Sequence, residues 1–202
     1  VGATGAGKTT ILSLIVRNYE IQQGQILIDG IDISKIKITS LRKAVGQMLQ
    51  DVFLFSGSIK TNITLHDEEF SEQEIADSCR YVNADKFIEN LENGVDSEVI
   101  ENGENFSQGQ KQLLSFARTI IHKPQILILD EATANIDTET EVLIQESLEK
   151  MKNIGTMLVV AHRLSTIQKA DQIIVLQHGS VIETGNHQSL LKQKGYYYKL
   201  YQ

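Results

Sequence analysis

The sequence is poor in cysteine, in long apolar runs and in positive charge, and each shortage argues against a class of protein or site. Its 202 residues contain one cysteine, Cys79, which excludes an internal disulfide and a metal cluster built on cysteines. The longest apolar runs, such as Ile126–Leu129 and Met157–Ala161, are far shorter than the roughly 18 residues of a membrane-spanning helix. The first residues lack the pattern of a signal peptide. The net charge of -7 argues against a broad basic face for nucleic acid, although it leaves room for a small basic pocket.

The remaining composition is typical of a globular domain with a substantial core. Hydrophobic residues make up 41% of the chain and charged residues 22%, both ordinary fractions. This length fits one domain, or one domain with an inserted subdomain. The first residue is Val1 rather than Met, and a motif begins almost at once. We therefore expect the natural protein to extend further upstream.

The order of apolar and polar segments predicts the α/β class, with a mostly parallel sheet flanked by helices. Continuous apolar strands that are separated by helices are typical of a parallel sheet covered on both faces. The predicted strands lie near residues 25–29, 44–48, 125–130 and 156–161, and the predicted helices near 10–18, 107–121 and 138–151.

Two further segments depart from this alternation. Residues 51–121 are more polar and helical, which predicts an inserted helical subdomain, with 1–50 and 122–202 as the core of a single domain over 1–202. Short strands near 172–176 and 180–183, joined through His178-Gly179, predict a hairpin. A residual small antiparallel part is therefore expected beside the parallel sheet.

A glycine-rich loop opens the chain with the pattern Gly-x-x-x-x-Gly-Lys-Thr, from Gly2 to Thr9. Glycines let the backbone wrap closely around a phosphate, and the N–H groups at the start of the next helix point at it. Lys8 would bring a positive charge to the β- and γ-phosphates, and the Thr9 hydroxyl is a hard oxygen ligand for Mg2+. The predicted nucleotide-binding residues are Gly2, Ala3, Thr4, Gly5, Ala6, Gly7, Lys8, Thr9 and Thr10.

An apolar strand ends in two adjacent acids, Asp130 and Glu131. Burying carboxylates costs free energy unless a partner compensates for it, and ligand sites in open α/β sheets lie at the carboxyl ends of strands. Asp130 is predicted to hold Mg2+ through water, and Glu131 to act as the general base that poises the attacking water. Taken alone, the two acids could instead cap the following helix. Beside a complete phosphate loop, we favour the magnesium and water roles.

Further residues resemble the ATP-binding domain of ABC transporters. Residues 105–118 read Asn-Phe-Ser-Gln-Gly-Gln-Lys-Gln-Leu-Leu-Ser-Phe-Ala-Arg, which resembles the signature motif of the family and its helix. The family pattern is Leu-Ser-Gly-Gly-Gln, from which Phe-Ser-Gln-Gly-Gln departs at the first and third positions. The resemblance implies that Ser107, Gly109 and Gln110 bind the γ-phosphate of ATP held by the opposite subunit.

Other positions match the family in the same order. Gln50 resembles the glutamine that contacts Mg2+ and water, and His162 resembles the switch histidine at the γ-phosphate. Ala134–Asp137 resembles the D-loop, and Glu101 the exporter-type loop before the signature. The resemblance thus implies the catalytic residues Lys8, Gln50, Glu131 and His162, and the metal ligands Thr9, Gln50 and Asp130.

The resemblance implies an ATP hydrolase that uses Mg2+ and drives transport as the motor domain of an exporter, at the cytoplasmic face of the cell membrane. Expected partners are a second nucleotide-binding domain, in a homo- or heterodimer, and a transmembrane domain fused upstream of Val1; nucleic acid is not expected. The alternatives are a separate ATPase subunit of an importer and a soluble ABC ATPase outside transport. Residues upstream of Val1, where the family also has its adenine-stacking aromatic, would decide between them.

Overall fold

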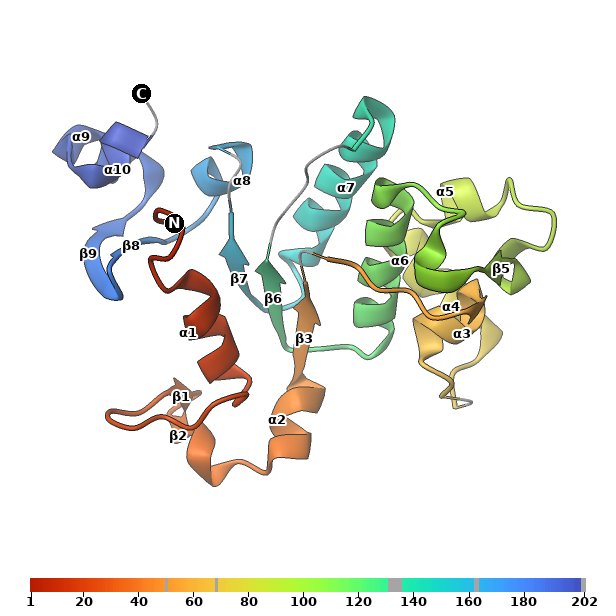
Figure 1. Cartoon of the computed structure of the whole chain (residues 1–202), viewed down its shortest axis with the longest axis horizontal. Coiled ribbons are helices and arrows are strands. Elements are labelled where there is room, and N and C mark those ends of the chain that lie inside the picture. The colour runs from red at the N-terminus through yellow and green to blue at the C-terminus, as the bar shows by residue number, and fades with distance from the viewer. Residues whose placement is uncertain (50, 68, 131–135, 162–163, 201–202) are drawn as a thin grey trace. The chain divides into compact units, whose positions relative to one another are not determined.

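The computed structural model describes residues 1–49, 51–67, 69–130, 136–161 and 164–200 (Figure 1). The chain divides into two compact units. Unit 1 consists of Val1–Leu41, Leu129–Ala132 and Val159–Gln202, and unit 2 of Arg42–Ile128 and Thr133–Leu158. The division into a core of 1–50 and 122–202 and a helical insertion of 51–121 stays a prediction.

A three-stranded sheet has the order β3-β6-β7, with β3 at Val45–Met48, β6 at Ile126–Asp130 and β7 at Thr156–Val160. The three strands run in the same direction (Figure 1). In the central strand β6, Leu127, Ile128 and Leu129 are 0%, 0% and 3% exposed, which explains its continuous apolar run. The predicted α/β class with a parallel sheet is confirmed.

The described residues also form three antiparallel pairs of strands. They are β1 (Leu27–Ile28) with β2 (Ile31–Asp32), β4 (Gly57–Ser58) with β5 (Glu98–Val99), and β8 (Ile173–Gln177) with β9 (Ser180–Gly185). The predicted hairpin through His178-Gly179 is confirmed, and both turn residues have positive φ, 49° and 77°. The small antiparallel part is likewise present, whereas the pairing of β4 with β5 was not predicted.

The helices fall into two groups along the chain. Those of residues 1–44 and 159–200 are α1 (Lys8–Ile15), the 3-10 helix η1 (Ile33–Lys35), α2 (Ile38–Ala44), α8 (Leu164–Gln168), α9 (His187–Gln193) and α10 (Tyr196–Leu200). Those between are α3 (Ile59–Thr64), α4 (Glu72–Tyr81), α5 (Asp85–Ile88), η2 (Gly94–Asp96), η3 (Glu101–Gly103), α6 (Gln108–Ile121) and α7 (Thr138–Met151). No helix among the described residues is both long enough and apolar enough to cross a bilayer.

The core of unit 1 packs the C-terminal helices against the β8–β9 hairpin. Its buried members are Ala161, Ile167, Ile173, Val175, Leu190 and Tyr197. The carboxylate of Glu183 accepts the backbone N–H groups of Tyr196 and Tyr197, and so satisfies donors at the start of α10. Helix α10, with Tyr197 buried, thus packs on its own unit.

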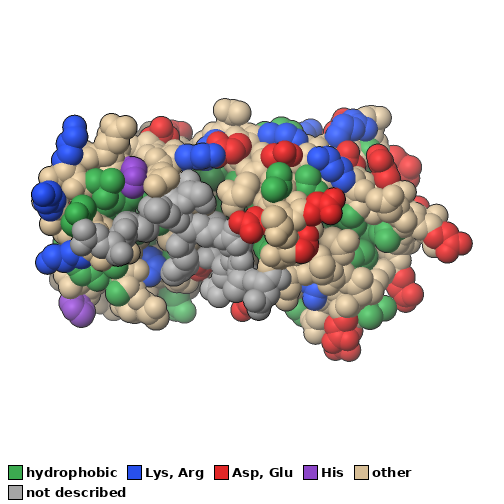
Figure 2. All heavy atoms as spheres, turned by 90° about the horizontal axis from the view of Figure 1, so that it is seen from above, with side chains coloured by type: hydrophobic (Ala, Val, Ile, Leu, Met, Phe, Trp, Pro, Cys, Tyr) green, Lys and Arg blue, Asp and Glu red, His purple; other side chains and the backbone are tan. Residues whose placement is uncertain are grey.

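Helix α6 is the centre of unit 2. It packs against α3, α4, α7 and β3, and Figure 1 draws it between α7 and the α3–α4 pair. Its buried apolar residues are Leu113, Leu114, Phe116, Ala117 and Ile121. The face shown in Figure 2 carries many acidic side chains as well as lysines and arginines, in keeping with a net charge of -7.

Candidate nucleotide-binding site

The glycine-rich loop ends in a left-handed residue that opens the start of α1. Gly7, the N-cap, has φ 98° and ψ 10°, a conformation that residues with a Cβ rarely adopt. No side chain caps this helix. The first N–H groups of a helix have no partner within the helix, so these donors are available to an anion.

Lys8 folds back over the loop that precedes it. Its ammonium group donates hydrogen bonds to the carbonyl oxygens of Gly2, at 2.8 Å, and of Ala3, at 2.9 Å. The cation is therefore held above the loop, where it would meet a bound phosphate. A phosphate oxygen carries more negative charge than a carbonyl oxygen and would compete with these two acceptors for the ammonium.

Thr9 and Asp130 meet although 121 residues separate them in the chain. The Thr9 hydroxyl donates a hydrogen bond of 3.3 Å to the Asp130 carboxylate. Thr9 lies in the first turn of α1, and Asp130 is the last residue of β6. Helix and strand thus bring a hydroxyl and a carboxylate together beside the phosphate loop.

This pair fits Mg2+. Both groups are hard oxygen donors, and Mg2+ is usually bound by one or two carboxylates, with phosphate and water oxygens completing its shell. Among the described residues no three His, Cys, Asp or Glu side chains gather into a site of their own. These residues therefore support a Mg2+ site in which the protein supplies few ligands and a bound nucleotide supplies others.

Three predicted site residues lie outside the described residues. Gln50, Glu131 and His162 fall in none of the described ranges, so their predicted roles rest on the sequence alone. Glu131 follows Asp130 directly in the chain, and His162 comes shortly after Val160, the last residue of β7.

Ser107 is the N-cap of α6 and stands at the surface. Its hydroxyl accepts the Gln110 N–H at 3.2 Å, and the Gln110 side chain accepts the Ser107 N–H at 2.9 Å, which makes a capping box. Ser107 is exposed and therefore not directed into the interior of its unit. Because the cap uses its oxygen as an acceptor, the hydroxyl hydrogen can still be donated to a ligand.

Packing requires a glycine at position 109, and the sequence did not reveal this requirement. A Cβ at this position would collide with the side chain of Thr140 on α7, and would lie 3.1 Å from Ile136 Cγ2. The residue is buried. Close packing of α6 on the start of α7 therefore requires glycine here, whatever ligand the neighbouring residues bind.

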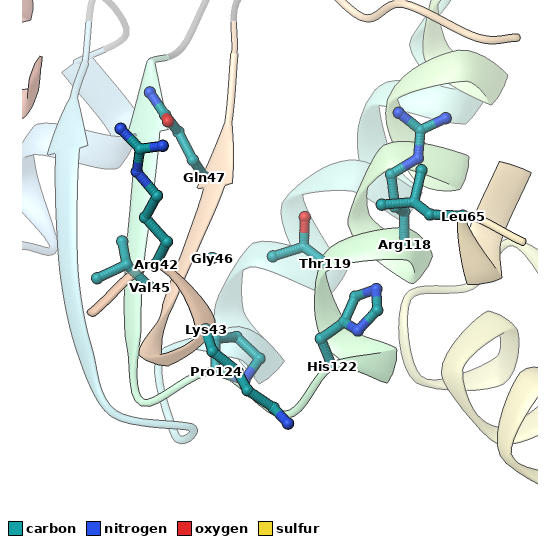
Figure 3. A pocket seen from close by; sticks show the side chains of 10 residues that line it. All are labelled: Arg42, Lys43, Val45, Gly46, Gln47, Leu65, Arg118, Thr119, His122 and Pro124. Carbon is teal, nitrogen blue, oxygen red and sulfur yellow. The ribbon is translucent and has the colours of Figure 1, made fainter. Parts of the chain in front are cut away.

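A pocket of about 290 Å³ in unit 2 is separate from the predicted site residues (Figure 3). Its lining comprises Arg42, Lys43, Val45, Gly46, Gln47, Leu65, Arg118, Thr119, His122 and Pro124. The guanidinium groups of Arg42 and Arg118 lie on opposite sides of the view, with Thr119 between them (Figure 3). Burial lowers the pKa of His122, which keeps its ring neutral near pH 7. The guanidinium groups of these two arginines therefore do not meet at one point in this view (Figure 3).

The Cys79 thiol and the paired side chains of Asn62 and Arg118 lie outside the predicted site. Burial raises the pKa of the Cys79 thiol to about 11, so the thiol stays protonated and is not a nucleophile. The paired side chains of Asn62 and Arg118 are a feature that sequence reasoning missed. Arg118 follows the buried Phe116 and Ala117 on α6, and a cation beside an apolar helix face was the available signal.

Comparison with known proteins shows that the chain is similar to ABC transporter proteins. The sequence profile of the family described as ABC transporter matches residues 1–134. The uncharacterized ABC transporter ATP-binding protein YfiC of Bacillus subtilis is 52% identical over 202 residues, which cover 100% of this chain and 33% of that protein. A fatty acid ABC transporter ATP-binding/permease protein of Mycobacterium bovis is 45% identical over 200 residues, covering 99% of this chain and 32% of that protein.

A solved structure agrees with these relatives. The structure of a bacterial Atm1-family ABC exporter with ATP bound matches with a TM-score of 0.91 and 40% identity. The match covers 99% of this chain and 35% of that one. The chain thus spans about a third of the length of these relatives.

Proposed function

Because the chain belongs to the ABC transporter family of ATP-hydrolysing domains, we propose that it is the motor domain of an exporter. In this proposal it binds ATP with Mg2+ at the cytoplasmic face of a membrane, and the longer protein moves the cargo. The observation that carries the proposal is the 3.3 Å contact of Thr9 with Asp130, beside a glycine loop with uncapped helix donors. Fusion to a transmembrane part is supported by the ATP-binding/permease relative.

Each residue of the described site has a distinct proposed task. The uncapped N–H groups at the start of α1 hold the phosphates, and Lys8 exchanges its two carbonyl partners for phosphate oxygens. Thr9 and Asp130 hold Mg2+, which would neutralise charge that develops on the phosphates. Residues 2–7 of the loop and residues 8–10 at the start of α1 together form the proposed nucleotide-binding segment.

The hydrolytic step is assigned to residues beyond the described part. Glu131 takes a proton from the attacking water, Gln50 orients that water and contacts Mg2+, and His162 contacts the γ-phosphate. The adjacency of Glu131 to Asp130 in the chain supports its place beside the metal.

A second nucleotide-binding domain is the proposed partner at Ser107. The exposed hydroxyl at the N-terminus of a 14-residue helix would meet the γ-phosphate held by the loop of the partner. Gln110 takes part through the capping box, and Gly109 by allowing the close packing of α6. ATP would then favour the closed pair of domains, and hydrolysis would release it.

The transmembrane partner is proposed to contact an apolar surface of unit 2. Leu49, Phe53, Phe55 and Leu65 are 58%, 54%, 51% and 47% exposed, and Leu65 also lines the pocket of Figure 3. Large exposed apolar side chains that cluster in the sequence on both sides of one short helix are typical of an interaction surface.

The test is Glu131→Gln in the full-length protein that contains this chain, with Glu92→Gln as the matched control. Glu92 is exposed and belongs to no proposed site. Loss of a general base should lower ATP turnover by about 100-fold or more, while ATP binding persists. The control should keep its turnover. Turnover near the wild-type rate in Glu131→Gln would remove Glu131 from the role of base.

A further inference from the structure

The segment that follows Gln50 is held in place by side chains from two helices. Residues 51–56 form neither helix nor strand. The buried side chain of Asn62, on α3, accepts the Phe55 N–H at 2.9 Å and donates to the Phe55 carbonyl at 2.8 Å and the Ser58 carbonyl at 3.0 Å. One amide group therefore satisfies both backbone groups of Phe55, as a neighbouring strand would.

Arg118 of α6 makes a second set of bonds to the same segment. Its guanidinium donates to the Phe53 carbonyl at 3.0 Å, the Asn62 carbonyl at 2.8 Å and the Asn62 side-chain oxygen at 3.0 Å. The planar fork of donors on arginine suits three acceptors in different directions, which a lysine ammonium cannot reproduce at one position. The Phe53–Phe55 backbone is thus fastened to α6 through Arg118 and Asn62.

The fastened segment carries an exposed aromatic pair. The rings of Phe53 and Phe55 meet edge to face with centroids 4.9 Å apart, and the Arg118 guanidinium lies 6.0 Å from the centroid of Phe55. Both phenylalanines are about half exposed. A partner that contacts these rings therefore acts on a backbone that moves with α6.

The other end of α6 bears Ser107. Arg118 lies on α6 and Ser107 is the N-cap of the same helix. An α-helix rises about 1.5 Å per residue and is stiff along its axis, so the two residues are joined by a rigid element. We propose that Arg118, acting with Asn62, is a positioning residue that couples the Phe53–Phe55 surface to Ser107. This inference rests on the proposed function, since it assigns the two ends of the connection to the transmembrane partner and to ATP.

The experiment compares Arg118→Lys with Arg80→Lys in the full-length protein in lipid nanodiscs. Arg80 forms an exposed ion pair with Asp77 on α4, and so gives the same substitution away from the clamp. Hydrogen exchange of residues 52–58 and 104–112 is measured with and without ATP and Mg2+, together with kcat and KM for ATP. Arg118→Gln, which introduces no buried ammonium, provides a second variant if the lysine variant fails to fold.

The proposal expects ATP to slow exchange in both segments of the wild type and of Arg80→Lys. In the Arg118 variants, residues 104–112 should still respond to ATP, while the response of 52–58 is lost. kcat should fall about 10-fold with KM changed by less than about 2-fold, because the variant leaves the phosphate loop intact. Adding Asn62→Ala to Arg118→Lys should lower kcat little further, since the two residues act as one unit.

Four outcomes would overturn the inference. An unchanged ATP response of 52–58 in the Arg118 variants, or a wild type in which only 104–112 responds, would overturn the coupling alone. Loss of the response in both segments would show a general loosening in place of a coupling. A wild type with no ATP response at 104–112 would overturn the proposed role of Ser107 and, with it, this inference.

Discussion

The starts of α1 and α6 are both proposed to hold phosphate, yet they are built in opposite ways. The α1 start has a left-handed glycine, Gly7, and no side-chain cap, so its donors wait for a ligand. The α6 start has a complete capping box between Ser107 and Gln110, so part of its donors are satisfied within the chain. An uncapped helix start costs stability that a ligand restores.

This difference assigns different shares of nucleotide binding to the two helices. The loop before α1 should supply most of the affinity, because it offers backbone donors and the Lys8 cation together. The start of α6 should contribute chiefly through the Ser107 hydroxyl, which keeps a hydrogen to donate. Substitutions on the two sides should therefore have unequal effects on binding and turnover.

Among substitutions at these helix starts, the largest effect is expected from Lys8→Met, which removes the cation and leaves the glycine loop. ATP turnover should fall about 100-fold, because one preorganised donor to a developing charge is worth that much. Lys35→Met, an exposed lysine of the same unit, is the control and should hydrolyse ATP normally. Steady-state hydrolysis and ATP-binding titrations measure both, and equal activity of the two variants would break the comparison.

Gly109→Ala should destabilise the fold by about 1–3 kcal/mol, because the added methyl group overpacks the contact with Thr140. Denaturant unfolding of the full-length protein or of this chain would measure the loss. Gly5→Ala is a useful contrast, since no atom lies within 4 Å of a Cβ there and only the positive φ of 77° opposes it. A neutral Gly109→Ala would mean that α6 and α7 separate easily.

Substitutions of Ser107 separate its capping role from its proposed ligand role. Ser107→Ala should cost about 1 kcal/mol of stability, the usual value of a lost N-cap, and should also lower ATP turnover. Ser107→Asp should keep the cap and the stability, but it places a negative charge where the γ-phosphate is expected. If Ser107→Asp hydrolysed ATP at the wild-type rate, the bridging role would be wrong.

A third helix start, that of α7, should give the smallest effect, and one that depends on pH. The hydrogen bonds that Asp137 accepts from Thr140 lower the pKa of its carboxyl below the usual 3.8. The stabilisation is therefore present above pH 3.8 and is lost as the pH falls through the lowered value. Asp137→Asn, which keeps a cap without the charge, should remove this pH dependence in unfolding curves measured from pH 6 down to about pH 2.

The glycine loop, the strand that ends at Asp130 and the helix that starts at Ser107 could be predicted because each depends on neighbours in the chain. A positive φ favours glycine, an apolar run with flanking helices predicts a buried parallel strand, and a serine before a helical pattern predicts a helix start. The hairpin through His178-Gly179 follows the same logic, since turn residues and strand patterns adjoin.

Other features had no local signal. The pairing of β4 with β5, the clamp of Asn62 and Arg118, and the fit of Gly109 against Thr140 each join residues tens of positions apart. A single sequence shows that Arg118 is a cation near an apolar helix face, but it does not show which carbonyls that cation binds.

By itself the sequence determined which chemical groups this protein carries, because a phosphate loop, paired acids and helix starts are defined by short-range stereochemistry. Only the tertiary structure decided which of these groups meet. The Thr9 hydroxyl reaches Asp130 because the fold places the first turn of α1 at the end of β6, and the segment after Gln50 is fastened to α6 because the half-buried guanidinium of Arg118 binds carbonyls far away in the chain. Packing over long separations in the chain selects such contacts, and no local pattern contains them.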